Sequence, residues 1–431
     1  MTSTLDVSAA RSVAFDLLRS VLARHKTFEN AMAIHDGFRR LPARDKGFAR
    51  LIVATTLRRL GQIDGLLDIC IEKPLPKAGD AVRDILRLGT AQMLFLGVAP
   101  HASVNSAVTL VESRKLTKFK GLTNAVLRRI SRDGGEMLAE FPDICNICGW
   151  MLAGWIEAFG EQTAARIATA SLAEPPLDIS VKENPEGWAE KLGARVLPTG
   201  TLRRRFEGPL EGMSGFSDGA WWVQDAAAAL PAKLLGDVQD RTVVELCAAP
   251  GGKTAQLILA KARLTAVDRS ETRLGRLKRN LSRLGLSTNL VTADATKWGP
   301  PAPVDAILLD PPCTSTGTIR RHPDILHSKS WAELTKLTAL QDRLLAAAVE
   351  MLKPGGRLVY CVCSLQPEEG EHRIAKFVES GVPVDLDPIR ADEIGGIVDA
   401  ITTQGELRTL PHHLGDKGGL DGFFAARLIR T

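Results

Sequence analysis

The feature that most constrains the fold of this chain is a change of pattern near residue 224. Before it, apolar residues between positions 8 and 130 recur at spacings of three and four, which predicts an all-α bundle. After it, short apolar runs alternate with segments of helical spacing, which predicts a parallel α/β sheet. We expect strands at 242–246, 264–267, 288–291, 304–309 and 357–362, and a last strand at 422–428.

The length of 431 residues fits two or three domains. We predict an all-α domain at 1–140, a linker helix with a small α+β insert at 141–223, and an α/β domain at 224–431. Proline-containing breaks near residues 41, 74 and 99 divide the first domain into five or six helices.

Composition excludes disordered, collagen-like and coiled-coil proteins, because 45% of the residues are hydrophobic and 24% are charged, as in ordinary globular domains. The chain shows neither a secretion signal nor about 18 consecutive apolar residues, so we expect no membrane span. Seven cysteines are too few for a disulfide framework, and a cytoplasmic location fits them best.

Positive charge is concentrated in the first third of the chain. Residues 1–133 hold 22 Lys and Arg against 12 Asp and Glu, whereas the remainder holds 33 against 38. Between positions 101 and 132, Glu112 is the one acid among seven basic residues: Arg114, Lys115, Lys118, Lys120, Arg128, Arg129 and Arg132. This cluster predicts a nucleic-acid partner through phosphate neutralisation. Charge alone favours a solvated helix face.

The first chemical motif is a turn of small residues that follows the strand at 242–246 and opens a helix. It consists of Cys247, Ala248, Ala249, Pro250, Gly251, Gly252 and Lys253. Such a turn lets backbone amides approach a ligand, and a helix N-terminus favours an anionic group. Its spacing is neither that of a Walker P-loop, which needs Gly at 247, nor Gly-x-Gly-x-x-Gly. A purely structural turn remains the alternative.

Acids follow three strands of the predicted sheet: Asp268, Asp294 and Asp310. Ligands of open parallel sheets bind beyond the carboxyl ends of the strands, and an acid after the second strand suits a ribose diol. The three acids together therefore predict a nucleoside site. Each one taken singly fits a helix cap equally well.

Two thiols complete the pattern. Cys313 ends the motif that begins at Asp310, at a place where methyltransferases acting on exocyclic amino groups have an aromatic residue. A thiol there suits attack on a ring carbon, or proton transfer near one. Cys361 and Cys363 share one face of the strand at 357–362. We interpret Cys361 as a buried structural residue and Cys363, at the exit of the strand, as reactive.

Two further pairs invite a metal interpretation that we do not adopt. Cys145 and Cys148 have the spacing of a zinc half-site, but no second pair of ligands accompanies them. The adjacent His412 and His413 fit a solvated loop better than a ligand set. We expect no metal.

At these motifs the sequence resembles the Sun-type RNA (cytosine-5) methyltransferases, in particular the bacterial branch that modifies small-subunit ribosomal RNA. The matching segments are 247–254, 310–313 with 320–324, and 363–369. The resemblance covers about residues 140–431, and the helical part before it resembles the NusB RNA-binding bundle. The chain departs from the family at Pro311 and Val362, where Ala and Thr are common, and at 180–182, where Arg-Val-Asn is expected.

The resemblance implies a Rossmann-like catalytic domain with S-adenosylmethionine as methyl donor. It assigns the Cys247–Lys253 turn to the cofactor, Asp268 to its ribose, Asp294 to its adenine, and Asp310 to both cofactor and base. It makes Cys363 the nucleophile and Cys313 its helper in product release. A thiolate must add at C6 before C5 of cytosine becomes nucleophilic, and a protonated Asp310 would stabilise the charge at N3.

The implied partner is RNA, with small-subunit ribosomal RNA favoured by the basic helical domain, and we expect a monomer. The same chemistry on transfer RNA is an alternative. A non-catalytic RNA-binding assembly factor is another, although the two thiols in a complete site disfavour it. The target base must be flipped or unpaired in either catalytic case.

Overall fold

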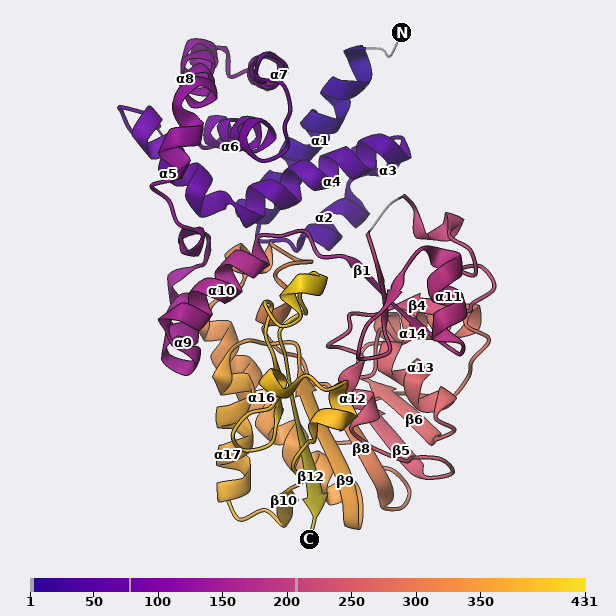
Figure 1. Ribbon diagram of the computed structural model, residues 1–431. Helices are drawn as coiled ribbons and strands as arrows, with labels where there is room; N and C mark the ends of the chain where they lie inside the picture. The colour runs from indigo at the N-terminus through magenta and orange to yellow at the C-terminus, as the bar shows by residue number, and fades with distance from the viewer. Residues whose placement is uncertain (1–3, 77–78, 206–207) are drawn as a thin grey trace. The chain divides into compact units, whose positions relative to one another are not determined.

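The computed structural model describes residues 4–76, 79–205 and 208–431. It contains two compact units (Figure 1). The helical unit comprises the described residues up to Ala173 together with Ile319–Lys329, which come from much later in the chain. The sheet unit comprises Glu174–Thr318 and the residues from Ser330 onward. The predicted domain limits at 140 and 223 remain predictions, since this division falls elsewhere and is not continuous in sequence.

The helical unit is a bundle, as its apolar spacing predicts. Its helices are α1 (Thr4–Leu22), α2 (Phe28–Ile34), α3 (Asp36–Arg40), α4 (Ala43–Arg58), α5 (Leu60–Cys70), α6 (Asp80–Leu94), α7 (Pro100–Ser113), α8 (Lys120–Leu138), α9 (Gly149–Phe159), α10 (Glu161–Ser171) and α15 (Ile325–Ser328). One hydrophobic core joins α1, α2 and α4 to α8, and Leu17, Leu18, Ile52, Leu57 and Leu127 in it are fully buried. This burial is what stabilises helices too short to persist alone.

More helices form between residues 8 and 130 than the five or six predicted, because α2, α3 and the break between α4 and α5 were missed. The Thr27 hydroxyl caps α2 by accepting from the Asn30 amide at 3.3 Å. His35 Nδ1 caps α3 by accepting from the Phe38 amide at 3.0 Å. These caps begin two short helices before the predicted break near residue 41.

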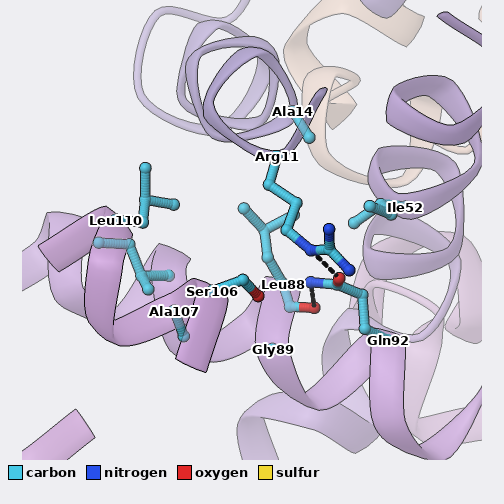
Figure 2. A pocket seen from close by; sticks show the side chains of 10 residues that line it. Arg11, Ala14, Ile52, Leu88, Gly89, Gln92, Ser106, Ala107 and Leu110 are labelled. Atoms are coloured by element: carbon cyan, nitrogen blue, oxygen red, sulfur yellow. Dashed lines mark hydrogen bonds between the residues drawn. The ribbon is translucent and has the colours of Figure 1, made fainter. Parts of the chain in front are cut away.

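A charged side chain lies inside this bundle (Figure 2). The Arg11 guanidinium donates to Gln92 Oε1 at 2.6 Å, and Gln92 Nε2 donates to the Leu88 carbonyl at 3.0 Å. The guanidinium also lies over the Phe48 ring at 5.1 Å. Burial lowers the pKa of Arg11. These contacts compensate for the water that the guanidinium loses on folding.

Residues 141–173, predicted as a linker, pack with the helical unit. Asn146 and Gln62 exchange two hydrogen bonds of 3.0 Å, one through the Gln62 amide and one through its side chain. Arg59 pairs with Asp143 at 3.1 Å. Trp155 of α9 is fully buried. These contacts join α5 to the segment that follows α8.

The small insert of the sheet unit is an antiparallel sheet of order β2-β3-β1-β4 with one helix. Its elements are β1 (Leu177–Val181), α11 (Pro185–Leu192), β2 (Arg195–Val196), β3 (Leu202–Arg204) and β4 (Trp221–Val223). A buried ion pair joins β1 to β3, with Arg203 Nε 2.6 Å from Asp178 Oδ1. Asp178 Oδ2 also accepts from the Ala226 amide at 3.0 Å, which ties the insert to the chain leading into the main sheet.

The main sheet has the order β10-β12-β9-β8-β5-β6-β7, with β11 beside β12. Its strands are β5 (Thr242–Leu246), β6 (Arg263–Asp268), β7 (Asn289–Thr292), β8 (Val304–Leu309), β9 (Leu352–Val362), β10 (Val384–Leu386), β11 (Leu407–Thr409) and β12 (Phe423–Arg430). Its helices are α12 (Leu230–Lys233), α13 (Gly252–Leu259), α14 (Glu271–Arg283), α16 (Trp331–Met351) and α17 (Glu371–Glu379).

The register of this sheet brings the motifs together. Leu246 of β5 pairs with Val267 of β6 on one side and with Leu309 of β8 on the other, all in parallel. The residues that follow these strands therefore meet at one edge of the sheet, as predicted. β12 runs antiparallel to β9, so the sheet is mixed and not wholly parallel as its strand–helix alternation had indicated. Among the described residues, no helix is long and apolar enough to cross a bilayer.

Candidate active site

The turn after β5 has the conformation that its small residues allow. Cys247 and Gly251 have φ of 63° and 103°, in the left-handed region. A Cβ at Gly251 would lie 2.9 Å from Leu277 Cγ, so a side chain there would be strained in backbone and crowded by α14. The turn can therefore approach both α14 and a ligand closely.

Asp268, at the end of β6, organises this turn. Its Oδ2 accepts from the Ala249 amide at 3.3 Å and its Oδ1 from the Ser270 amide at 3.0 Å. Arg273 donates to the Ala249 carbonyl at 2.6 Å and lies 3.5 Å from Asp268 Oδ2. The carboxylate is buried and fixed before any ligand binds, with lone pairs remaining for a diol.

A pocket of about 440 Å³ opens beside Asp268. Cys247, Asp268 and Asp294 line it together with apolar side chains, among them Leu340 of α16. This volume lies within the range of cofactor sites. The combination of acids for hydroxyls and an apolar wall for a flat ring fits a nucleoside.

Asp294 is exposed, and one of its oxygens is used locally. Oδ1 accepts from the Thr296 hydroxyl at 2.7 Å and from the Thr296 amide at 3.0 Å, and these bonds lower the pKa of Asp294. The residue therefore caps a turn, the alternative considered above, and also lines the pocket. The two roles are compatible because its second oxygen takes no part in the cap.

Lys253 and Asp310 form an ion pair at the same edge of the sheet. Lys253 Nζ donates to Asp310 Oδ2 at 2.7 Å and lies over the Phe423 ring at 5.0 Å. Burial opposes the charge of Lys253, but the neighbouring Asp310 raises its pKa well above the ordinary value. The side chain of Lys253 is thus a buried cation directed at Asp310, a role that its place in the cofactor turn did not indicate.

The two predicted thiols meet. Cys313 Sγ and Cys363 Sγ are 3.5 Å apart, and the Ser315 hydroxyl lies 3.8 Å from Cys313 Sγ. The hydrogen bond between the thiols, aided by burial, raises the pKa of Cys313 well above its usual value. The same hydrogen bond lowers the pKa of Cys363, against the effect of burial. Either sulfur can donate in this pair, and the opposite directions of the two pKa shifts favour the proton on Cys313.

Other sulfurs nearby are less suited to attack. Burial, with the charges of Asp310 and Asp268, raises the pKa of Cys247 to about 12. Burial also raises the pKa of the fully buried Cys361 well above the normal range, so the geometry agrees with its interpretation as structural. Only the ionised thiolate is an effective nucleophile.

Glu369 is a site residue that the sequence reasoning passed over, although it lies in the quoted 363–369 segment. It is fully buried and accepts from the Thr314 amide at 3.0 Å, the Thr314 hydroxyl at 2.5 Å and Gln341 Nε2 at 3.0 Å. The Ser364 hydroxyl lies 3.2 Å from that of Thr314. Glu369 thereby fixes the residue after Cys313 beside the residue after Cys363.

Not every sequence motif joins this site. Residues 320–324 belong to the helical unit, where Asp324 Oδ2 accepts from the Phe28 amide at 3.0 Å. His412 and His413 stack edge to face with ring centroids 4.9 Å apart. Within the described ranges, no three His, Cys, Asp or Glu side chains are grouped as metal ligands, and Cys145 and Cys148 are free thiols.

Comparison with known proteins agrees with this geometry. Residues 232–429 match the family model for the 16S rRNA methyltransferase RsmB/F, and residues 8–132 match the NusB family. Ribosomal RNA small subunit methyltransferase B of Escherichia coli O17:K52:H18 (strain UMN026 / ExPEC) is 31% identical over 438 residues, covering 97% of this chain and 98% of the relative. The chain belongs to the RsmB/F methyltransferase family.

A second relative supports the same assignment. The small subunit methyltransferase B of Salmonella paratyphi B (strain ATCC BAA-1250 / SPB7) is 32% identical, with 97% of this chain and 98% of the relative covered. The crystal structure of PH0851 has the same fold, with a TM-score of 0.75 at 23% identity, over 99% of this chain and all of that chain. The predicted fold class is confirmed: a NusB-like helical domain with a Rossmann-like methyltransferase domain.

Family membership makes this chain an RNA methyltransferase that uses S-adenosylmethionine. The pocket beside Asp268 is compatible with that cofactor, since it offers a fixed carboxylate, a turn open to close approach and an apolar wall. S-adenosylmethionine, when bound, supplies an electrophilic methyl group.

Proposed function

We propose that this chain methylates carbon 5 of a cytosine in small-subunit ribosomal RNA, through a covalent bond between Cys363 and carbon 6. The observation on which this rests is the 3.5 Å pairing of Cys313 with Cys363, which leaves Cys363 with the lowered pKa. Methylation of an exocyclic nitrogen needs no nucleophilic thiol, whereas C5 is unreactive until a thiolate adds at C6.

The site residues act in sequence. The Cys363 thiolate forms a bond to C6, and the displaced electron pair moves toward N3. Lys253 donates a hydrogen bond to Asp310, so we assign the stabilisation of N3 to this pair and not to an isolated protonated Asp310. Carbon 5 then takes the methyl group and must lose its own proton.

Cys313 is suited to that proton and to product release. Its pKa is raised chiefly by the hydrogen bond to Cys363, and that cause disappears once the Cys363 sulfur is bonded to C6. Cys313 then loses its thiol proton to solvent, and its thiolate takes the proton from C5. The electron pair of the C5–H bond forms the C5–C6 double bond, and Cys363 leaves as thiolate.

We assign the ribose hydroxyls of the cofactor to Asp268, its adenine side to Asp294, and its amino acid part to the Cys247–Lys253 turn. The lining of the pocket supports the first two assignments. The left-handed Cys247 and Gly251 support the third, because they leave the turn open to close approach.

Mapping of 5-methylcytosine in total RNA tests the proposal. Cells that lack the gene should lose the modification in small-subunit ribosomal RNA, and the wild-type gene should restore it while Cys363→Ala should not. Loss confined to transfer RNA would identify the alternative substrate. Restoration by Cys363→Ala would refute the covalent mechanism, and the absence of any methyl transfer by the purified chain would favour a non-catalytic assembly factor.

A further inference from the structure

A second cavity, of about 540 Å³, lies within the helical unit. It is lined by side chains of α2, α3 and α4 and by two residues of the segment 319–329. Phe28, Met32 and Phe38 give it apolar walls. Its basic side chains are Arg39, Lys46, Arg50 and Arg321, and His322 and the acid Glu29 complete it.

The later segment is fixed in place as part of this cavity. Arg58 Nη2 donates to the Arg320 carbonyl at 2.8 Å, and the Phe28 amide donates to Asp324 at 3.0 Å. His327 Nε2 lies 2.8 Å from the Leu57 carbonyl, and burial lowers the pKa of that imidazole, so the neutral ring donates to the carbonyl. The cavity is therefore built partly from the stretch of chain that begins six residues after Cys313.

The basic side chains of the cavity differ from those of the basic cluster at 114–132 in how far acids pair with them. In that cluster, Arg114 pairs with Asp16 at 2.8 Å and Lys120 with Glu112 at 2.5 Å. In the cavity, Lys46 and Arg50 lie one turn apart on α4, and within the described residues neither has an acid at ion-pairing distance.

Glu29, the acid of the cavity wall, does not cancel this charge. Glu29 is exposed, and its carboxylate lies 4.0 Å from His322. Arg39 of the wall is paired with Asp36, three residues earlier on α3. Two neighbouring cations beside apolar and aromatic walls thus face an open volume.

We propose that this cavity binds one nucleotide of the substrate RNA, with Lys46 and Arg50 on its phosphate and the Phe38 ring and Met32 against its base. Neighbouring cations match a phosphate, and a ring beside them offers a stacking surface that accepts any base. The inference rests on the RNA substrate of the proposed function, but it concerns a contact apart from the thiols and the cofactor pocket.

The test is RNA binding by the full chain, measured by fluorescence anisotropy over a range of salt concentrations. The probes are a transcript of small-subunit ribosomal RNA and a short single-stranded RNA of mixed sequence. Lys46→Gln with Arg50→Gln should weaken binding about tenfold and reduce the slope of log affinity against log salt by about 1.4, or about 0.7 for each lost contact. The matched control, Arg24→Gln with Arg166→Gln, removes the same charge outside the cavity and should change neither quantity.

Phe38→Leu separates stacking from charge, because it keeps an apolar side chain and removes the ring. It should weaken binding severalfold with an unchanged salt slope. Equal losses in the cavity pair and the control pair would overturn the proposal, as would cavity variants that bind free cytidine monophosphate less well but RNA normally. A wild-type chain that makes no 5-methylcytosine while its RNA affinity still depends on Lys46 and Arg50 would refute the proposed function and leave the cavity assignment standing.

Discussion

The two sides of the active site differ in how far apart in the sequence their contacting residues lie. On the cofactor side, Asp268 and Asp294 accept hydrogen bonds from residues no more than 19 positions away. On the thiol side, the contact between Cys313 and Cys363 joins residues 50 positions apart. The hydrogen bond from the Thr314 amide to Glu369 joins residues 55 positions apart. The cofactor side is thus assembled locally and the thiol side by the whole sheet. Changes to the first should affect affinity, and changes to the second should affect rate.

The largest effect is expected at the thiols. Cys363→Ala should abolish both turnover and any covalent RNA adduct, because no other thiol nearby has a lowered pKa. Cys313→Ala should still attack and methylate, then accumulate RNA attached through Cys363. A denaturing gel with cofactor and substrate RNA measures this, and exposed Cys145→Ala serves as control. An adduct in Cys363→Ala alone would exchange the two roles.

The same pair of variants has a pH signature. The hydrogen bond from Cys313 lowers the pKa of Cys363, so the thiolate persists to lower pH than an ordinary thiol allows. Removing that bond in Cys313→Ala should move the midpoint of adduct formation to higher pH, as followed by single-turnover gels. An unchanged or lower midpoint would show that Cys313 does not activate Cys363.

A smaller effect is expected on the cofactor side. Asp268→Ala should weaken S-adenosylmethionine binding by about 1 to 3 kcal/mol, or roughly 5- to 150-fold, because two ribose hydroxyls lose their acceptor. Asp294→Ala should have a weaker effect, since Asp294 is exposed. Calorimetry on the folded variants measures both. Equal affinities for the wild type and Asp268→Ala would remove the ribose assignment.

Glu369 distinguishes the two sides most directly. Glu369→Gln replaces one acceptor oxygen by a donor and cannot satisfy Thr314 and Gln341 together, so the thiols should be displaced and turnover should fall about tenfold. Cofactor affinity should not change. The exposed Glu379→Gln is the matched control. A loss of cofactor affinity with normal turnover would contradict the separation drawn above.

The smallest effect is expected from the basic cluster. Replacing Lys118, Lys120, Arg128 and Arg129 by Ala would reduce the salt slope of RNA binding by about 2.8 units, or about 0.7 for each contact, if all four contacted phosphates. Lys120 already pairs with Glu112, and Arg129 donates to the Ile69 carbonyl at 3.2 Å. We therefore expect a reduction of at most about 1.4 units, from Lys118 and Arg128. A full reduction would make this surface, and not the cavity at Lys46, the principal RNA contact.

Sequence patterns predicted the structure correctly where the residues that determine it are neighbours in the chain. Short apolar runs predicted β5 to β9 and β12 but not β10 and β11, and the parallel register brings Asp268, Asp310 and Cys363 to one edge. Reading Cys363 as reactive and Cys361 as structural needed only their places at and before the strand exit.

The remainder depends on contacts that no local pattern encodes. Nothing near Lys253 in the sequence indicates that its ammonium reaches Asp310, 57 residues later. Arg114 pairs with Asp16, which lies 98 residues earlier in the chain. The sequence around 114–132 does not show this pairing, so it overstates how much of the cluster is available to bind RNA. The antiparallel β12 was expected as a strand, but its direction is set by the loops before it.

The excursion of residues 319–329 into the helical unit limits how this chain can be divided. α15 packs against α1 and α4, and its Ile325 and Leu326 are buried. A fragment that keeps only the methyltransferase half would expose these side chains to water. The two halves therefore cannot be cut apart, or exchanged with those of other proteins, at a single point in the gene. Exchange of the helical unit would have to supply a new surface for residues 319–329 as well as a new junction.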